Sequence, residues 1–113
     1  MTPRQRHSQR LDALTRANKI RDRRKRLKLR LKAGRVTLAS VLRANAEYTR
    51  TMRLRELLLA TPGIGVTKAD RALRVVNLSH LTQLRALTAT DREVLLAYIA
   101  ERFPAVGETQ VAA

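Results

Sequence analysis

Residues 57–73 read LLLATPGIGVTKADRAL, an apolar helical pattern that is interrupted once and then resumes. The interruption is the tetrapeptide PGIG at residues 62–65. Glycine adopts backbone conformations that are closed to other residues, so two glycines one residue apart are typical of a tight turn. The stretch therefore predicts two short helices, one over residues 53–60 and one beginning near residue 67, joined by this turn.

The turn between these helices has two interpretations. It is either a plain corner, or a place where the first N–H groups of the second helix, together with the helix dipole, meet an anion. Ile64 is expected to pack into the core and hold the turn rigid. Lys68 lies one turn into the second helix and Arg71 follows it, so both can add positive charge at the same anion. These two cations favour the anion site over the plain corner.

The N-terminal part of the chain predicts one long helix. From Arg10 to Ala33 there is no Pro or Gly, and Gly34 provides a typical helix end. Ile20, Leu27 and Leu31 share one stripe, which predicts that the last turns of this helix dock on the core while the first turns project. We expect residues 1–9 to form a flexible tail and residues 10–34 to form the helix.

The C-terminal part predicts a bundle of short helices. Thr37 is expected to cap a helix over residues 38–48, and Thr67 with Asp70 forms a weak capping box. Ser79 is expected to cap a short segment, and Thr90 with Glu93 to open a last helix that stops at Pro104. The expected fold is all-α: a long basic N-terminal helix, a compact bundle of four to five short helices over residues 35–104, and a flexible tail over residues 105–113.

Charge divides the chain into two unlike halves. Residues 1–55 hold 18 Lys or Arg against three acids, whereas residues 56–113 hold six of each. The whole net charge of +15 therefore belongs to the first half. Ten basic residues lie between Lys19 and Arg35, opposed only by Asp22. A cationic segment joined to a neutral compact unit is typical of a protein that binds a polyanion such as nucleic acid.

The composition argues against several other classes of protein. His7 and His80 lie beside no acids at catalytic or ligand spacing, and cysteine is absent, so we expect no enzyme, no metal and no cofactor. No apolar run reaches the length of a membrane span, and the N-terminus lacks the apolar segment of a signal peptide. We therefore expect a cytoplasmic protein that does not bind membranes. With only three aromatic residues, stacking on single strands is disfavoured.

Four blocks of sequence resemble those of actinobacterial integration host factors, which carry a helix-two-turns-helix domain. They are RLKAG at the end of the basic helix, then LASVL, then TMRLRELLLATPGIGVTKADRAL, and finally LRALTATDREVLLAYI. The PGIG turn alone is shared with many nucleic-acid binders, whereas the four blocks in this order are more specific. The resemblance covers roughly residues 16–103 and implies a helix-two-turns-helix bundle behind a long helix.

The resemblance also implies which residues meet DNA. The positions that match the phosphate-binding turn and helix start are Gly63, Ile64, Gly65, Val66, Lys68 and Ala69. Arg53 matches a family lysine, and Arg85 matches the last arginine of a basic cluster. The chain departs from the family at Val66, where a lysine is usual, and at residues 81–83, where arginines are usual. We therefore expect much of the attraction to come from the basic helix, through Arg21, Arg24, Lys25, Lys28 and Lys32.

The function implied by the resemblance is that of a nucleoid-associated protein. Such proteins bind duplex DNA through its backbone with little sequence preference, bend or compact it, and assist site-specific recombination. The implied partners are double-stranded DNA and an integrase of a phage or mobile element, with the chain a monomer in solution. The alternative is an RNA-binding module like a small-subunit ribosomal protein, which uses a similar Gly-Ile-Gly turn beside a basic extension.

Overall fold

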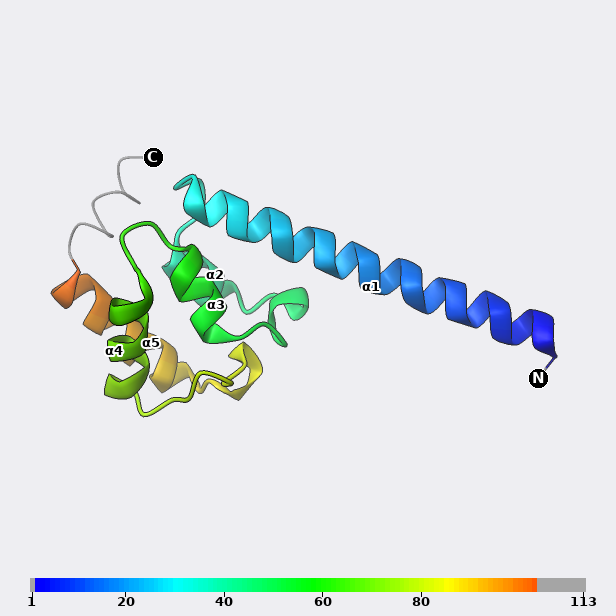
Figure 1. The fold of residues 1–113 in the computed structure, drawn as a ribbon. Helices are drawn as coiled ribbons and strands as arrows, with labels where there is room; N and C mark the ends of the chain where they lie inside the picture. The colour runs from blue at the N-terminus through cyan, green and yellow to red at the C-terminus, as the bar shows by residue number, and fades with distance from the viewer. Residues whose placement is uncertain (1, 104–113) are drawn as a thin grey trace.

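The computed structural model describes residues 2–103, which form an all-α fold (Figure 1). Within these residues, five α-helices and two short 3-10 helices follow one another. Their bounds are α1 Pro3–Lys32, α2 Leu38–Ala44, η1 Glu47–Thr49, α3 Leu54–Ala60, α4 Val66–Val75, η2 Leu84–Ala86 and α5 Ala89–Arg102. The described residues contain no strand, and one isolated antiparallel bridge joins Arg53 to Gln83. The predicted fold class is confirmed, while the predicted tail over residues 105–113 and the stop at Pro104 lie outside the described residues.

Helix α1 begins earlier than the sequence analysis predicts. Thr2 caps it, because its hydroxyl accepts from the Gln5 N–H at 3.2 Å and the Gln5 side chain accepts from the Thr2 N–H at 2.8 Å. Pro3 occupies the first helical position, where its missing N–H costs nothing. The helix therefore starts at Pro3 rather than at residue 10, and residues 3–9, which were predicted to belong to a flexible tail, are helical. At the other end, Gly34 follows the last turn as predicted and adopts a left-handed conformation, with φ 72°.

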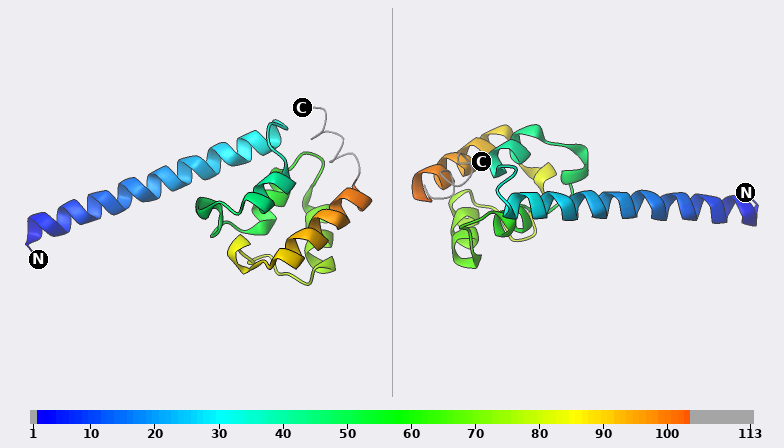
Figure 2. Two further views of the ribbon diagram at one scale, coloured as in Figure 1. Left: turned by 180° about the vertical axis from the view of Figure 1, so that it is seen from behind. Right: turned by 90° about the horizontal axis from the view of Figure 1, so that it is seen from above.

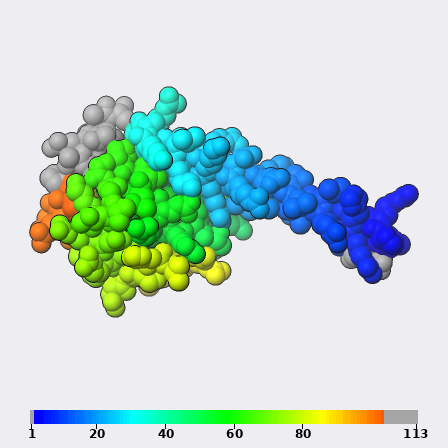
Figure 3. Space-filling model, viewed as in Figure 1, coloured from blue at the N-terminus to red at the C-terminus, as the bar shows by residue number. Residues whose placement is uncertain are grey.

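The two halves of α1 have different surroundings. Leu27 and Leu31 are buried in the core, whereas Leu11 and Leu14 are about half exposed. Ile20, with 38% of its surface exposed, lies between the docked and the projecting parts of the helix. Figure 2 shows α1 leaving the bundle as a straight rod, and Figure 3 shows how little of the bundle touches its N-terminal half. The prediction that the last turns dock while the first turns project is confirmed.

Side chains of α1 fix the angle at which it leaves the bundle. Arg24 Nε donates to the Tyr48 carbonyl at 2.9 Å, and its guanidinium also contacts the Thr51 hydroxyl. The Arg23 guanidinium lies 4.2 Å from the centre of the Tyr48 ring. One turn further on, Lys28 forms an ion pair with Glu56 at 2.6 Å. These contacts attach α1 to η1 and α3, so the projecting part continues from a rigid base.

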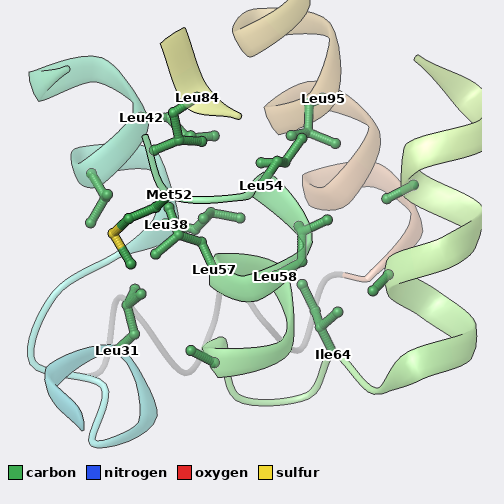
Figure 4. Close-up of a cluster of buried hydrophobic side chains, with 14 of the residues drawn as sticks. Leu31, Leu38, Leu42, Met52, Leu54, Leu57, Leu58, Ile64, Leu84 and Leu95 are labelled. Atoms are coloured by element: carbon green, nitrogen blue, oxygen red, sulfur yellow. The ribbon is translucent and has the colours of Figure 1, made fainter. Parts of the chain in front are cut away.

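Leucine side chains from α1, α2, α3 and α5 meet in one core (Figure 4). Leu42, Leu54, Leu57, Leu58 and Leu95 are fully buried there. The core is almost entirely aliphatic, with Met52 in the connection before α3. Ala69 and Ala72 let α4 pack close to α3. This packing holds the turn between α3 and α4 in place.

Several predicted helix boundaries are wrong. The second helix ends at Ala44, because Asn45 takes a left-handed conformation with φ 48°, and residues 47–49 form a separate 3-10 turn. Ser79 does not cap a helix; its N–H and hydroxyl bond to the side chain of Thr82, and the 3-10 helix begins at Leu84. The capping box of α5 is Thr88 with Asp91 rather than Thr90 with Glu93.

Arg92 ties three segments of the bundle together, which gives a stability prediction. Its guanidinium donates to the carbonyls of Leu42 and Leu84 and to the side chain of Asn45, at 2.7–3.1 Å. Replacing Arg92 with Met would leave the end of α2 without this donor, and we expect a loss of about 1–3 kcal/mol in the free energy of unfolding, measured by urea denaturation. The control Arg74→Met changes an exposed arginine and should stay within about 0.5 kcal/mol. Equal losses would contradict this role.

Candidate nucleic-acid interface

The segment between α3 and α4, residues 61–65, is a rigid turn that we call the glycine turn. The buried Thr61 hydroxyl donates to the Leu57 carbonyl at 2.9 Å, and the Ile64 N–H donates to the Thr61 carbonyl at 3.2 Å. Gly63 has φ 86°, a conformation that favours glycine. Ile64 is only 5% exposed, so it anchors the turn in the core as predicted (Figure 4).

No side chain within residues 2–103 caps the N-terminus of α4. Its N-cap residue is Gly65, which has no side chain, and α3 likewise begins without a side-chain cap, whereas threonine hydroxyls cap α1, α2 and α5. The predicted capping box of Thr67 with Asp70 does not form, because the helix starts at Val66 and Asp70 pairs with Arg55 instead. The first N–H groups of any helix have no intrahelical acceptor, so those of α4 remain available to an anion.

Open space lies in front of Gly65. A Cβ built at this position meets no atom within 4 Å, and the backbone has φ −94°, which any residue adopts. The fold itself therefore does not require glycine here. Absence of a side chain leaves room for a phosphate to approach the N–H groups, while the buried Ala69 lies on the inner side of the helix.

Lys68 reaches back over the glycine turn. Its ammonium donates to the Gly63 carbonyl at 3.1 Å and lies 5.2 Å from the centre of the Phe103 ring, at the end of α5. The ammonium is thus held beside the open N-terminus of α4. Phe103 was not among the predicted site residues, because 35 residues separate it from Lys68 and no local pattern links the two.

The other predicted residues of α4 lie on its outer surface. Val66, which replaces the family lysine, is 56% exposed at the first position of the helix. Arg71 is exposed one turn beyond Thr67. The structure therefore gathers Gly63, Gly65, Val66 and Lys68 at one end of α4, with Arg71 further along it.

Arg85 lies in a second group of basic residues, which is separate in sequence from the glycine turn and from Lys68. A cleft of about 560 Å³ is formed where α1 passes η1 and η2, and we call it the arginine cleft. Tyr48 lines the cleft together with four arginines. These are Arg23, Arg24, Arg50 and Arg85. Arg23 and Arg50 were not among the predicted contacts. The backbone bond from the Arg85 N–H to the Arg50 carbonyl, 2.8 Å long, brings the two segments together.

Arg53 lies neither at the glycine turn nor in the arginine cleft. It lines a separate surface cleft together with Arg55, Glu56, Leu59 and His80. In that region Asp70 accepts from Arg55 at 3.2 Å and lies 3.3 Å from Nε2 of His80. The structure thus does not join Arg53 to the glycine turn, although both flank the same helix, α3.

The predicted cations of α1 fall into two groups. Arg24 and Lys28 are committed to contacts with the bundle, Arg24 to Tyr48 and Thr51 and Lys28 to Glu56. Arg21, Lys25 and Lys32 are exposed and, within residues 2–103, form no ion pair with a carboxylate. These three are the ones free to meet an external anion.

Several acids of the bundle are paired with basic side chains. Glu56 pairs with Lys28, Asp70 with Arg55, and Glu93 with Arg43. Hydrogen bonds from Arg43 lower the pKa of Glu93 below its usual range, so this carboxylate stays charged and paired. Each of these pairs neutralises one acid and one base, so the net positive charge of the chain rests on cations outside them.

Two further observations concern what the described residues lack. No group of His, Asp and Glu within residues 2–103 is arranged to hold a metal ion. No described helix combines the length and the apolar character needed to cross a membrane.

The arrangement belongs to a class of all-helical fold already known from a solved structure. That structure is sIHF, an integration-host-factor-type protein, bound to an 8-base-pair palindromic DNA. The two chains match with a TM-score of 0.68 at 23% sequence identity, over 74% of this chain and 97% of that chain. No family model matches the chain, and no curated protein does. The match shows that this chain has the sIHF fold.

Proposed function

We propose that the protein binds duplex DNA through its phosphate backbone, with little dependence on sequence. The observation that carries this proposal is the uncapped N-terminus of α4 behind a rigid turn, with the Lys68 ammonium held beside it. Backbone N–H groups at a helix start are a general site for phosphate. A net charge of +15 supplies the long-range attraction.

Two supports come from outside this site. The neighbour that shares the fold, sIHF, was solved with DNA. The cations of α1 are spread along a helix of 30 residues, and charge extended over this length matches the extended charge of a duplex better than that of a small anion. Phosphate contacts fix position but read no sequence, so low sequence preference follows.

The finer parts of the proposal rest on the family resemblance. We infer that the chain bends or compacts DNA in the nucleoid, acts without catalysis, cofactor or metal, and assists an integrase in site-specific recombination. Bending is testable by fluorescence transfer between the two ends of a labelled duplex: added protein should raise the transfer efficiency, and an unchanged efficiency at saturation would contradict bending.

The experiment that tests the proposed function is a competition assay at one stated salt concentration. A labelled duplex is bound first, and unlabelled duplex DNA, single-stranded DNA and structured RNA are added in separate titrations. We expect the duplex to compete best and single-stranded DNA worst, since stacking platforms are scarce. If structured RNA displaced the duplex at lower concentration than unlabelled duplex did, the ribosomal-type RNA-binding alternative would replace this proposal.

A further inference from the structure

Phe103 makes an unusual contact for a residue at the end of a helix. Its ring lies 5.2 Å from the Lys68 ammonium, which itself reaches across the glycine turn to the Gly63 carbonyl. The ring is partly buried against the core and packs edge-on against Tyr98, with centroids 5.8 Å apart and an interplanar angle of 89°. The Phe103 N–H donates to the Ile99 carbonyl at 2.8 Å, so the backbone is held as well.

Among the described residues, the Lys68 ammonium is held by uncharged groups, the Gly63 carbonyl and the Phe103 ring. Within residues 2–103 no carboxylate forms an ion pair with it, and the nearest acid on its own helix, Asp70, is engaged by Arg55 and His80. A carbonyl and a ring face leave the positive charge uncompensated, whereas a carboxylate would neutralise it. The ammonium is therefore placed at the turn and still able to bind an anion.

A long lysine side chain is otherwise poorly ordered on a helix surface. Fixing its four rotatable bonds carries an entropic cost, which a bound phosphate must otherwise offset. The ring of Phe103 and the Gly63 carbonyl restrict the side chain before any ligand arrives. Because α5 supplies the ring, the last helix of the bundle contributes to a site that the turn and α4 otherwise form alone.

We propose that Phe103 is a positioning residue: its ring holds the Lys68 ammonium over the glycine turn, where it meets the same phosphate as the N–H groups of α4. This inference rests on the proposed function, since the phosphate is that of duplex DNA. It predicts that the ring stays beside the ammonium when DNA is bound. Binding would then keep the ring contact and add the phosphate to it.

The test compares Phe103→Leu with Phe103→Tyr in the full chain. Leu keeps an apolar side chain against the core but removes the ring face, whereas Tyr keeps the ring. We expect Phe103→Leu to weaken duplex binding by about two- to fivefold at low salt, the value of an exposed cation–π contact. Phe103→Tyr should bind as the native chain does. In a Lys68→Ala background, Phe103→Leu should have no further effect.

A measurement without DNA tests the contact itself. Ring currents should displace the proton resonances of the Lys68 ε-methylene in the nuclear magnetic resonance spectrum of the native chain, and Phe103→Leu should return them to their ordinary position. A structural role alone would change the melting temperature but would not depend on Lys68. Equal or tighter binding by a folded Phe103→Leu variant, or an equal loss in the Lys68→Ala background, would overturn the proposal. If the native chain failed to bind duplex DNA while the ring-current shift was present, the proposed function would fall and the Lys68–Phe103 contact would stand.

Discussion

Replacing Gly65 with Asp is expected to remove most duplex binding while leaving the fold intact. The backbone at Gly65 suits any residue, and a new Cβ meets no atom within 4 Å. Aspartate is a good N-cap residue, so its carboxylate should accept from the first N–H groups of α4 and stabilise the helix by a few tenths of a kcal/mol. The same carboxylate would occupy the place of the phosphate and repel it. Loss of charge-assisted hydrogen bonds costs about 1.5–3 kcal/mol, a fall in affinity of about 10- to 100-fold.

Two controls separate this effect from simpler ones. Gly65→Asn has the same size and also caps, but it carries no charge, so its loss of affinity should be smaller. Ala89→Asp adds the same charge at the first position of α5, at the opposite end of that helix from Phe103, and should change affinity little. Affinity is measured by fluorescence anisotropy and stability by thermal unfolding. A folded Gly65→Asp variant with native affinity would remove the glycine turn from the DNA interface.

Local signals in the sequence predict much of this fold. The glycine turn, the burial of Ile64 and the docking of α1 through Leu27 and Leu31 all follow from residue type and spacing. The start of α1 was also readable, since Thr2, Pro3 and Gln5 form a standard helix start. The polar composition of the first nine residues concealed that signal, because polarity is common to flexible tails and exposed helices.

What could not be predicted depends on contacts between distant segments. Thr88 with Asp91 and Thr90 with Glu93 both have capping-box spacing, and only Thr90 with Glu93, which carries the usual Glu, was predicted. In the structure Glu93 bonds to Arg43, 50 residues away, which leaves Asp91 to cap α5. Lys68 with Phe103 is a similar case. Such pairings require the folded arrangement of helices, which no local spacing encodes.

In the candidate site, too, features that depend on neighbouring residues were predicted, whereas features that depend on distant contacts were not. Residues of the glycine turn are brought together as predicted because they are adjacent in the chain. The cations of α1 were predicted as one uniform group, yet the structure commits Arg24 and Lys28 to the bundle and leaves others exposed. Packing partners decide this difference, since η1 and α3 lie under one face of α1 only. A test of the charge of α1 must therefore change the exposed cations and leave those that contact the bundle.

The last prediction concerns four exposed cations on the middle of α1. The set changed to Gln consists of Lys19, Arg21, Lys25 and Arg26, all exposed in the structure. Gln keeps the helix propensity, so α1 should persist. If two to three of the four meet phosphates, the slope of log affinity against log salt should become shallower by about 2–3, because each neutralised phosphate contributes about 0.9. At about 0.1 M salt this corresponds to a loss of about 10²- to 10³-fold.

The matched control changes four cations of the N-terminal half of α1, which are also exposed: Arg4, Arg6, Arg10 and Arg16. Both variants lower the net charge by the same amount, so a difference between their salt slopes reports position rather than total charge. The glycine turn lies toward the C-terminal end of α1, and the tip points away from the bundle (Figures 1 and 2). One duplex that meets the turn should therefore meet the middle of α1 before the tip, and the middle set should have the larger effect. An equal fall for both sets would mean that α1 attracts DNA only through its overall charge, and a larger fall for the tip would place the duplex on the outer half of α1.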